Sequence, residues 1–288
     1  MGNAWIARYF DCTEGNAKII QIAKEEIEAD KKRELSTPNL VASPMTFIQR
    51  LLANQSQNPE SVNEREIITH CFNNIAAGSD TTAIALRSVI FNTLKNPNVH
   101  RRLNREVREA FPSGDVASVT YGAASKLPYL GAAIKEALRV HPSVGMPLVR
   151  IVPPDGATIC GQFFQPGVEV GVNPWVVHRD PTVFGDPDIF RPERWLREHT
   201  SEEQIRDMNR SWIPFGHGAH TCSGRWISWM EVHKATATLF SVFDMELVDG
   251  GEAYAFCNLW LTPQTGLKVS VKTWIQSGCD LSSTRASR

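Results

Sequence analysis

The chain has 288 residues, of which 42% are hydrophobic and 21% are charged, enough apolar content to bury the core of one large domain or two ordinary ones. Its 30 Lys and Arg residues balance 31 Asp and Glu residues, so the formal net charge of −1 provides no overall basic field for binding nucleic acid. The six cysteines lack the paired spacing of a disulfide scaffold. Met1–Phe10 shows no secretory signal, and no apolar run approaches the ~20 residues that span a bilayer. Membrane contact is therefore expected only if an N-terminal anchor is missing from this sequence.

Apolar residues spaced one helical turn apart predict that residues 1–141 are helical. The third of the expected helices has about 30 residues and would be roughly 45 Å long. Ser61 and Glu64 have capping-box spacing at its start, and small and apolar side chains over 75–86 predict that its middle is buried on most sides. The expected helices are 18–34, 46–54, 64–94, 97–111 and 128–140, with a breaker-rich connection at 37–44.

Short strand-like segments split by Pro and Gly replace the helices after His141 and Pro142. We therefore expect a mainly α-helical fold with small β-sheets that forms a single domain over 1–288. Its parts are a helical region (1–141), a region of strands and loops (142–225) and a final helix and hairpin (226–272). The later segments are strands at 149–152, 158–160, 163–164 and 168–172, loops at 175–196 and 212–224, a buried helix at 226–243, a hairpin at 259–272 and a disordered tail at 276–288.

A single cysteine lies in the glycine-rich loop Phe215-Gly216-His217-Gly218-Ala219-His220-Thr221-Cys222-Ser223-Gly224. Gly218 and Gly224 permit positive φ angles and a close approach of the backbone to a flat ligand or a sulfur. Cys222 precedes a predicted helix, where free amide groups and the helix dipole favour a thiolate. Two other interpretations are a buried, inert cysteine and a zinc site made by His217, His220 and Cys222. The complete spacing favours a haem thiolate over both.

This loop resembles the haem-binding loop of the cytochrome P450 family, Phe-x-x-Gly-x-Arg-x-Cys-x-Gly, at every fixed position except one. His220 stands where most members have arginine. The resemblance implies that Cys222 is the axial ligand of a haem b iron and that His220 donates a hydrogen bond to a haem propionate. It also implies that Phe215, Gly218 and Gly224 contribute to cofactor binding, with Phe215 packed beneath the haem face.

The sequence Ala77-Gly78-Ser79-Asp80-Thr81-Thr82, within the longest predicted helix, resembles the oxygen-activation motif of the same family. Gly78 weakens the helix and the Thr81 hydroxyl can compete for a backbone carbonyl, which predicts a local opening for dioxygen and water. Asp80 and Thr81 would form an acid–alcohol pair that passes protons to bound oxygen. Ordinary helix packing is the alternative, although polar residues in so apolar a stretch are costly to bury without partners.

Four further charged residues match family motifs. Glu136 and Arg139 form Glu-x-x-Arg, and Arg194 lies in Pro-Glu-Arg-Trp, where Trp195 replaces the common phenylalanine. By themselves Glu136 and Arg139 are typical of a surface pair; by resemblance they form, with Arg194, a buried structural cluster that holds the loop beneath the haem. Arg150 lies in an apolar strand-like segment, where the alternatives are an extended side chain reaching water and, by resemblance, a haem propionate ligand.

Substrate contacts are implied by the resemblance at apolar positions on the long helix, after the Glu-x-x-Arg helix and near the last hairpin. Their composition suggests a small apolar organic substrate, although core packing explains the same composition. These residues are Phe72, Ile75, Ala76, Val144, Leu148 and Leu259.

The resemblance covers residues 18–272 and implies a monooxygenase that uses dioxygen and receives electrons from an NADPH-cytochrome P450 reductase. It corresponds to the second part of a family member, so an N-terminal portion is expected to be missing. The sequence is similar to filamentous-fungal members that make secondary metabolites such as mycotoxins or pigments, whose full-length forms lie on the endoplasmic reticulum membrane. The alternative is a truncated, non-catalytic remnant that binds haem weakly or not at all.

Overall fold

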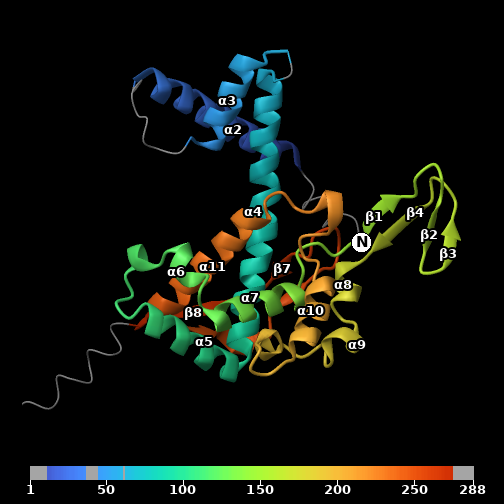
Figure 1. The fold of residues 1–288 in the computed structure, drawn as a ribbon. Helices are drawn as coiled ribbons and strands as arrows, with labels where there is room; N and C mark the ends of the chain where they lie inside the picture. Colours follow the sequence, from blue (N-terminus) through green and yellow to red (C-terminus); the bar gives the residue numbers. More distant parts are fainter. Residues whose placement is uncertain (1–11, 37–44, 61, 275–288) are drawn as a thin grey trace, which may run out of the picture. The chain divides into compact units, whose positions relative to one another are not determined.

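The structure is a computed structural model that describes residues 12–36, 45–60 and 62–274. Over these residues it is mainly α-helical with small two-stranded antiparallel sheets, as the sequence predicted (Figure 1). The predicted connection at 37–44 and the predicted tail at 276–288 lie outside the described residues.

The chain divides into two compact units, Met1–Ser79 and Asp80–Arg288, and each contains a hydrophobic cluster of its own. The single domain expected from the sequence stays a prediction. Among the described helices, none combines the length and the apolar composition that a membrane span requires.

The first unit contains three helical segments, all of them predicted from the sequence. They are α2 (Cys12–Ser36), α3 (Phe47–Gln57) and the first half of α4 (Glu64–Lys95). Thr46 and Gln49 form a capping box that fixes the start of α3. The buried cluster of this unit is small, since it consists of Ala23, Ile27, Ile67 and Cys71.

Two hydrogen bonds between Asn63 and Glu66 fix the start of α4. The Asn63 side chain accepts a hydrogen bond from the Glu66 amide at 3.0 Å, and the Glu66 carboxylate accepts one from the Asn63 amide at 2.8 Å. Asn63 and Glu66 therefore form a capping box directly before α4, which begins at Glu64. Ser61, the residue predicted to cap this helix together with Glu64, lies outside the described residues.

The middle of α4 is less buried than predicted. Ile75 and Asp80 are exposed, whereas Ile84, Ala85 and Val89 are buried. The small and apolar composition of 75–86 indicated burial all round, but only one face of this helix packs against a core.

The second unit has a helical layer in which α5, α7 and α11 pack against one another (Figure 1). Pro97 and Pro128 occupy the first turns of α5 and α7, where a missing amide proton costs no helical hydrogen bond. The prediction for 128–140 is confirmed at both ends. The bounds are α5 (Pro97–Ala110), α6 (Tyr121–Ala124), α7 (Pro128–Val140), α11 (Arg225–Val242) and the 3₁₀ turns η1 (Val116–Ser118) and η4 (Val248–Gly251).

The four predicted strands form two antiparallel pairs in the structure. β1 (Leu148–Ile151) pairs with β4 (Glu169–Val172), and β2 (Ala157–Ile159) pairs with β3 (Gln162–Phe164). Cys160 and Gly161 both have positive φ angles at the tight turn between β2 and β3.

The predicted hairpin at 259–272 is wrong. β7 (Gln264–Thr265) pairs with β6 (Ala255–Phe256), and β8 (Val269–Thr273) pairs with β5 (Phe243–Leu247) instead. The alternation of apolar residues identified strand-like segments, but their partners come from upstream residues whose pairing a local pattern does not specify.

The two predicted loops contain short helices. The segment 175–196 folds into α8 (Pro174–Val177), α9 (Pro181–Phe184) and the 3₁₀ helix η2 (Pro192–Trp195). The cysteine loop contains the 3₁₀ turn η3 (Gly218–His220). Between them lies α10 (Glu202–Ser211), a helix that the sequence analysis missed, with Ser201 as its N-cap.

Candidate functional site

The cysteine loop connects α10 to α11 and places a thiol just before the longer helix. The Cys222 amide donates to the Phe215 carbonyl oxygen at 2.8 Å, which closes the loop, and Gly224 is the N-cap of α11. Gly218 adopts the positive φ that a glycine permits, at 74°, whereas Gly224 has a φ of −83° that any residue can adopt. The second left-handed residue is Gly216, with a φ of 72°.

The exposure of Cys222 separates the three interpretations of this loop. Its thiol is exposed, which contradicts the interpretation of a buried, inert cysteine. His217 and His220 are exposed as well, and the described residues include no group of three His, Cys, Asp or Glu side chains placed to hold a metal ion. The zinc interpretation is therefore not supported, because its three ligands do not converge.

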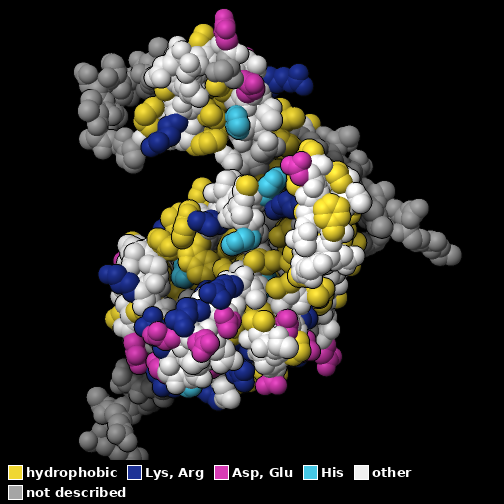
Figure 2. Space-filling view, turned by 45° about the vertical axis from the view of Figure 1, so that its right-hand side comes forward, with side chains coloured by type: hydrophobic (Ala, Val, Ile, Leu, Met, Phe, Trp, Pro, Cys, Tyr) yellow, Lys and Arg dark blue, Asp and Glu magenta, His cyan; other side chains and the backbone are white. Residues whose placement is uncertain are grey.

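Exposed apolar side chains follow Cys222 closely in the sequence. Trp226, Ile227 and Met230 are exposed on the first turns of α11, so the prediction of a wholly buried final helix is wrong at this end. Figure 2 shows hydrophobic side chains reaching the surface of the second unit, with basic and acidic side chains gathered elsewhere on the same face. A haem held by a thiolate needs a cysteine sulfur and apolar contacts for its ring, and side chains of both kinds are present here.

The two residues predicted to bind propionates lie on different elements. Arg150 is half-buried in β1, and its Nη1 donates to the Val149 carbonyl oxygen at 2.7 Å. His220 is exposed at the end of η3. Both are hydrogen-bond donors of the type that a carboxylate accepts, and their roles stay predictions.

The segment of α4 that carries Asp80 and Thr81 is fixed to the rest of the second unit by two hydroxyl groups. The Ser143 hydroxyl donates to the Thr81 carbonyl oxygen at 2.8 Å, and the Thr82 hydroxyl donates to the Ser228 hydroxyl on α11 at 3.2 Å. The helix is continuous through Gly78 and Thr81, so the local opening expected there does not appear as a break. Asp80 is exposed, and its role in proton transfer stays a prediction.

The structure brings together two of the segments predicted to contact substrate. Val144 and Leu261 form an antiparallel bridge, and the Gly145 amide donates to the Trp260 carbonyl oxygen at 3.0 Å. A Cβ atom at Gly145 would lie 1.8 Å from Asn258 Oδ1, so only glycine permits this approach. Val144 and Leu259 therefore lie on two segments that pair with each other through backbone hydrogen bonds.

Leu148 lies beside the cysteine loop, because its Cδ1 is 3.9 Å from the position that a Cβ atom would take at Gly216. Phe72, Ile75 and Ala76 share one stripe of α4 at the spacing of a helical turn, but they belong to the first unit. Their contact with substrate stays a prediction.

The predicted ionic cluster is present and fully buried. Glu136 and Arg139 are 0% exposed and Arg194 is 3% exposed. Arg139 reaches both carboxylate oxygens of Glu136 at 2.9 Å, and Arg194 Nε reaches Oε1 at 2.9 Å. The surface-pair interpretation is therefore wrong, since every charge in the cluster is withdrawn from water.

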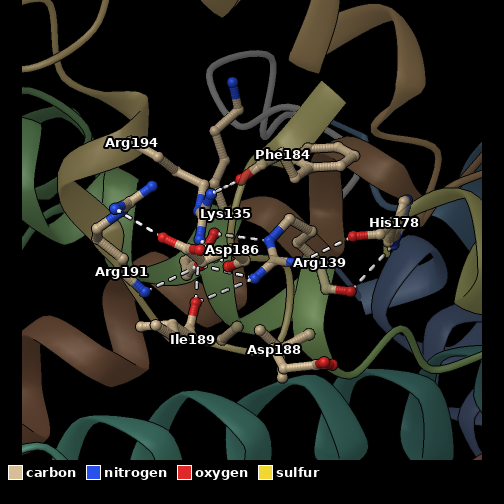
Figure 3. Close-up of polar contacts among 12 residues, drawn as sticks. Lys135, Arg139, His178, Phe184, Asp186, Asp188, Ile189, Arg191 and Arg194 are labelled. Atoms are coloured by element: carbon tan, nitrogen blue, oxygen red, sulfur yellow. Dashed lines mark hydrogen bonds and ion pairs between the residues drawn. The ribbon is translucent and has the colours of Figure 1, made fainter. Parts of the chain in front are cut away.

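Backbone carbonyl oxygens satisfy the remaining guanidinium donors of the cluster. Arg194 donates to Phe184, to Asp186 at 2.9 Å and to Ile189 at 3.0 Å, so the cluster holds the segment from α9 to η2 in place (Figure 3). Arg139 donates to the His178 carbonyl oxygen at 2.8 Å.

Tryptophan at position 195 has a polar function that the sequence analysis missed. Its indole Nε1 donates to Glu136 Oε2 at 2.9 Å, a hydrogen bond that the more common phenylalanine cannot form. Lys135 lies nearby with its ammonium 4.6 Å from the Trp195 ring and 5.4 Å from the Trp212 ring. Burial lowers the pKa of Lys135 to about 8.

His178 is a second residue to which the sequence analysis gave no function. It is 0% exposed, and burial together with the positive charges of Arg139 and Arg179 lowers its pKa to about 3. Its two ring nitrogens contact the Arg139 carbonyl oxygen and the Ile213 amide. A histidine followed by Arg-Asp-Pro between two predicted elements was the available signal, but nothing local identifies those two partners.

Comparisons with known proteins agree with this geometry. The family model described as Cytochrome P450 matches residues 7–271. A "Cytochrome P450 monooxygenase cicH" of Emericella nidulans is 34% identical over 257 residues, which cover 88% of this chain and 51% of that protein. A "Cytochrome P450 monooxygenase cfoH" of Aspergillus candidus is 35% identical over 265 residues, which cover 90% of this chain and 49% of that protein.

The fold agrees with a solved structure as well. The crystal structure of a cytochrome P450 (CYP102L1) superimposes with a TM-score of 0.74 at 23% identity, covering 90% of this chain and 56% of that one. The expected fold class is thereby confirmed, and this chain spans about half the length of the curated relatives it matches. With an exposed thiol just before α11 and a buried glutamate–arginine cluster, this chain belongs to the cytochrome P450 family.

Proposed function

We propose that this chain carries the cofactor-binding part of a haem-thiolate monooxygenase that acts on a small apolar organic substrate. The observation that carries the proposal is the exposed Cys222 thiol, presented by a loop with two left-handed glycines at the start of an 18-residue helix. The family implies a haem cofactor; haem b and ligation by Cys222 are the parts that we propose.

The residues of the loop bind and orient the cofactor in this proposal. Cys222 would ligate the iron through its sulfur, Arg150 on β1 and His220 would donate to the propionates, and Phe215 would pack against the ring. When bound, haem supplies the oxidative chemistry, in which two electrons and two protons let one atom of dioxygen enter the substrate while the other leaves as water.

Asp80 and Thr81 handle protons in the same proposal. The Thr81 hydroxyl would pass its proton towards bound oxygen, and Asp80, exposed to solvent, would take up a proton from water and, as the carboxylic acid, return one to Thr81. Ser143 fixes the backbone of this turn through the Thr81 carbonyl oxygen, so the pair keeps its position on α4.

Substrate, partner and location follow from the same reasoning. The apolar side chains of Val144, Leu148 and Leu259 would contact an apolar substrate. An NADPH-cytochrome P450 reductase would supply the electrons. The similarity to fungal monooxygenases supports a role in making secondary metabolites, with full-length relatives on the endoplasmic reticulum membrane.

A carbon-monoxide difference spectrum of the haem-loaded, reduced chain tests the ligand. We expect the red-shifted absorption band of a thiolate-ligated ferrous haem, its loss in Cys222→Ala, and its retention in Cys160→Ala, which removes another exposed thiol outside the loop. A chain recovered only without haem would support the alternative of a non-catalytic remnant. A spectrum unchanged in Cys222→Ala would contradict the assigned ligand.

A further inference from the structure

His178 lies between the buried ionic cluster and the cysteine loop. Its Nδ1 is 3.2 Å from the Arg139 carbonyl oxygen, and its Nε2 is 2.8 Å from the Ile213 amide nitrogen. In return, the Arg139 guanidinium donates to the His178 carbonyl oxygen at 2.8 Å. Residues 139 and 178 thus exchange two hydrogen bonds, one from each side chain, and Figure 3 shows their side chains next to each other.

The protonation of the ring follows from these partners. A backbone amide can only donate, so Nε2 must accept from Ile213 through its lone pair. A carbonyl oxygen can only accept, so Nδ1 must carry the proton and donate to Arg139. Both bonds form together only in the neutral imidazole with its proton on Nδ1, because an imidazolium would direct a second N–H group at the Ile213 amide.

Three hydrogen bonds connect the segment next to this ring with the backbone of Cys222. The Ile213 carbonyl oxygen accepts from the Gly216 amide at 3.0 Å, which forms the turn that enters the cysteine loop. The Phe215 carbonyl oxygen accepts from the Cys222 amide at 2.8 Å, which closes that loop. The position of Ile213 therefore fixes where the loop begins, and the loop in turn fixes Cys222.

We infer that His178 is a positioning residue for the Cys222 loop, joining the ionic cluster to the loop through its Nδ1-protonated ring. The inference rests on the proposed function only in giving Cys222 the role of iron ligand. The cluster of Glu136, Arg139 and Arg194 holds the segment before η2, whereas His178 is the described side chain that hydrogen-bonds both to Arg139 and to Ile213.

Two amide variants of His178 separate positioning from simple packing. In His178→Gln the longer side chain can place its amide oxygen near the position of Nε2 and accept from Ile213. In His178→Asn the shorter side chain can reach only the position of Nδ1, so it donates to Arg139 and leaves the Ile213 amide without its acceptor. Both replace the ring by a neutral amide, so loss of the ring is common to them.

The experiment uses the haem-loaded full chain and two readouts. Hydrogen–deuterium exchange of the peptide containing Ile213 should be about tenfold faster in His178→Asn than in the wild type, and close to the wild-type rate in His178→Gln. The fraction of thiolate-ligated haem in the carbon-monoxide difference spectrum should fall in His178→Asn and recover in His178→Gln. Equal effects of both variants, or none, would overturn the inference.

The ring proton is measured on the wild type, which removes any dependence on how the variants fold. In nitrogen-15 NMR of labelled histidine, the ring signal assigned to His178 should show the proton on Nδ1. Buried His233, whose Nδ1 lies 2.8 Å from the Trp229 carbonyl oxygen, should give a second such signal that is independent of His178. A proton on Nε2 of His178 would overturn the inference. If the wild type shows no thiolate-ligated haem, the proposed function fails. The exchange rates and the position of the ring proton then still test whether His178 connects Arg139 to Ile213.

Discussion

Replacing Glu136 by glutamine tests whether the buried cluster depends on its one negative charge. In the wild type, Oε1 accepts from Arg139, Arg194 and the Arg191 amide, and Oε2 accepts from Arg139 and Trp195, all at 2.9 Å. Glutamine keeps the shape but turns one acceptor into a donor, and it leaves two buried guanidinium groups without a counter-charge. Removing one partner of a buried pair costs about 3–5 kcal/mol, a large part of the 5–15 kcal/mol that stabilises a typical protein.

Urea unfolding followed by tryptophan fluorescence measures the effect. With a slope of about 2 kcal/mol per molar urea, the midpoint of Glu136→Gln should lie about 1.5–2.5 M below that of the wild type. Glu231→Gln is the matched control, since Glu231 is exposed in the middle of α11, and it should change the free energy of unfolding by less than about 0.5 kcal/mol. Equal midpoints for the two variants would refute the reasoning that the carboxylate compensates both arginines.

Three further changes have expected outcomes. Trp195→Phe removes the hydrogen bond to Glu136 and should lower the free energy of unfolding by about 1.5–3 kcal/mol in the same urea assay; a smaller change than in the control would contradict a role for the indole N–H. Burial lowers the pKa of His178 to about 3 in the folded chain, so below pH ~6.5 only the unfolded chain protonates this ring. The free energy of unfolding should therefore fall by about 2 kcal/mol between pH 7 and pH 5. This part of the loss should be absent in His178→Gln. Gly216→Ala should lower the free energy of unfolding by about 1–2 kcal/mol, because residue 216 has a φ of 72°. Gly131→Ala is the control inside α7, where a Cβ atom would meet only an ordinary contact at 3.9 Å, and it should raise the free energy of unfolding by up to about 1 kcal/mol. The reverse order in thermal unfolding would contradict the assigned backbone strain.

Local signals were sufficient where a segment forms its own structure. Pro128 at the first turn and His141-Pro142 after the last turn fixed both ends of α7. By contrast, α10 has a clear N-cap in Ser201 but only Ile205 and Met208 packed inward, so its apolar pattern was too sparse to predict a helix. Pairing was least predictable, since β8 joins β5 across more than twenty residues.

The candidate site, like the fold, was predictable only where its residues form a local sequence motif. The spacing of Phe215, Gly218 and Cys222 located the loop, and the motif residues Glu136 and Arg194 located the cluster, because both patterns are written in short stretches of sequence. The hydrogen bonds of Ser143 and His178 to the chain around them arise from tertiary packing, and no periodicity in the sequence encodes them. The exposure of Ile75 and Trp226 likewise depends on which faces the fold covers, not on their apolar character.

The tight crossing at Gly145 also bears on how this enzyme family can diversify. The Leu259 carbonyl oxygen lies 2.6 Å from the position that a Cβ atom would take at residue 145, so this position requires glycine. Val144 and Leu259 lie next to it on two segments that backbone hydrogen bonds hold together. If Val144 and Leu259 contact substrate as proposed, a mutational library that keeps Gly145 and randomises these two positions would change the preference for substrate while main-chain bonds keep the two segments paired.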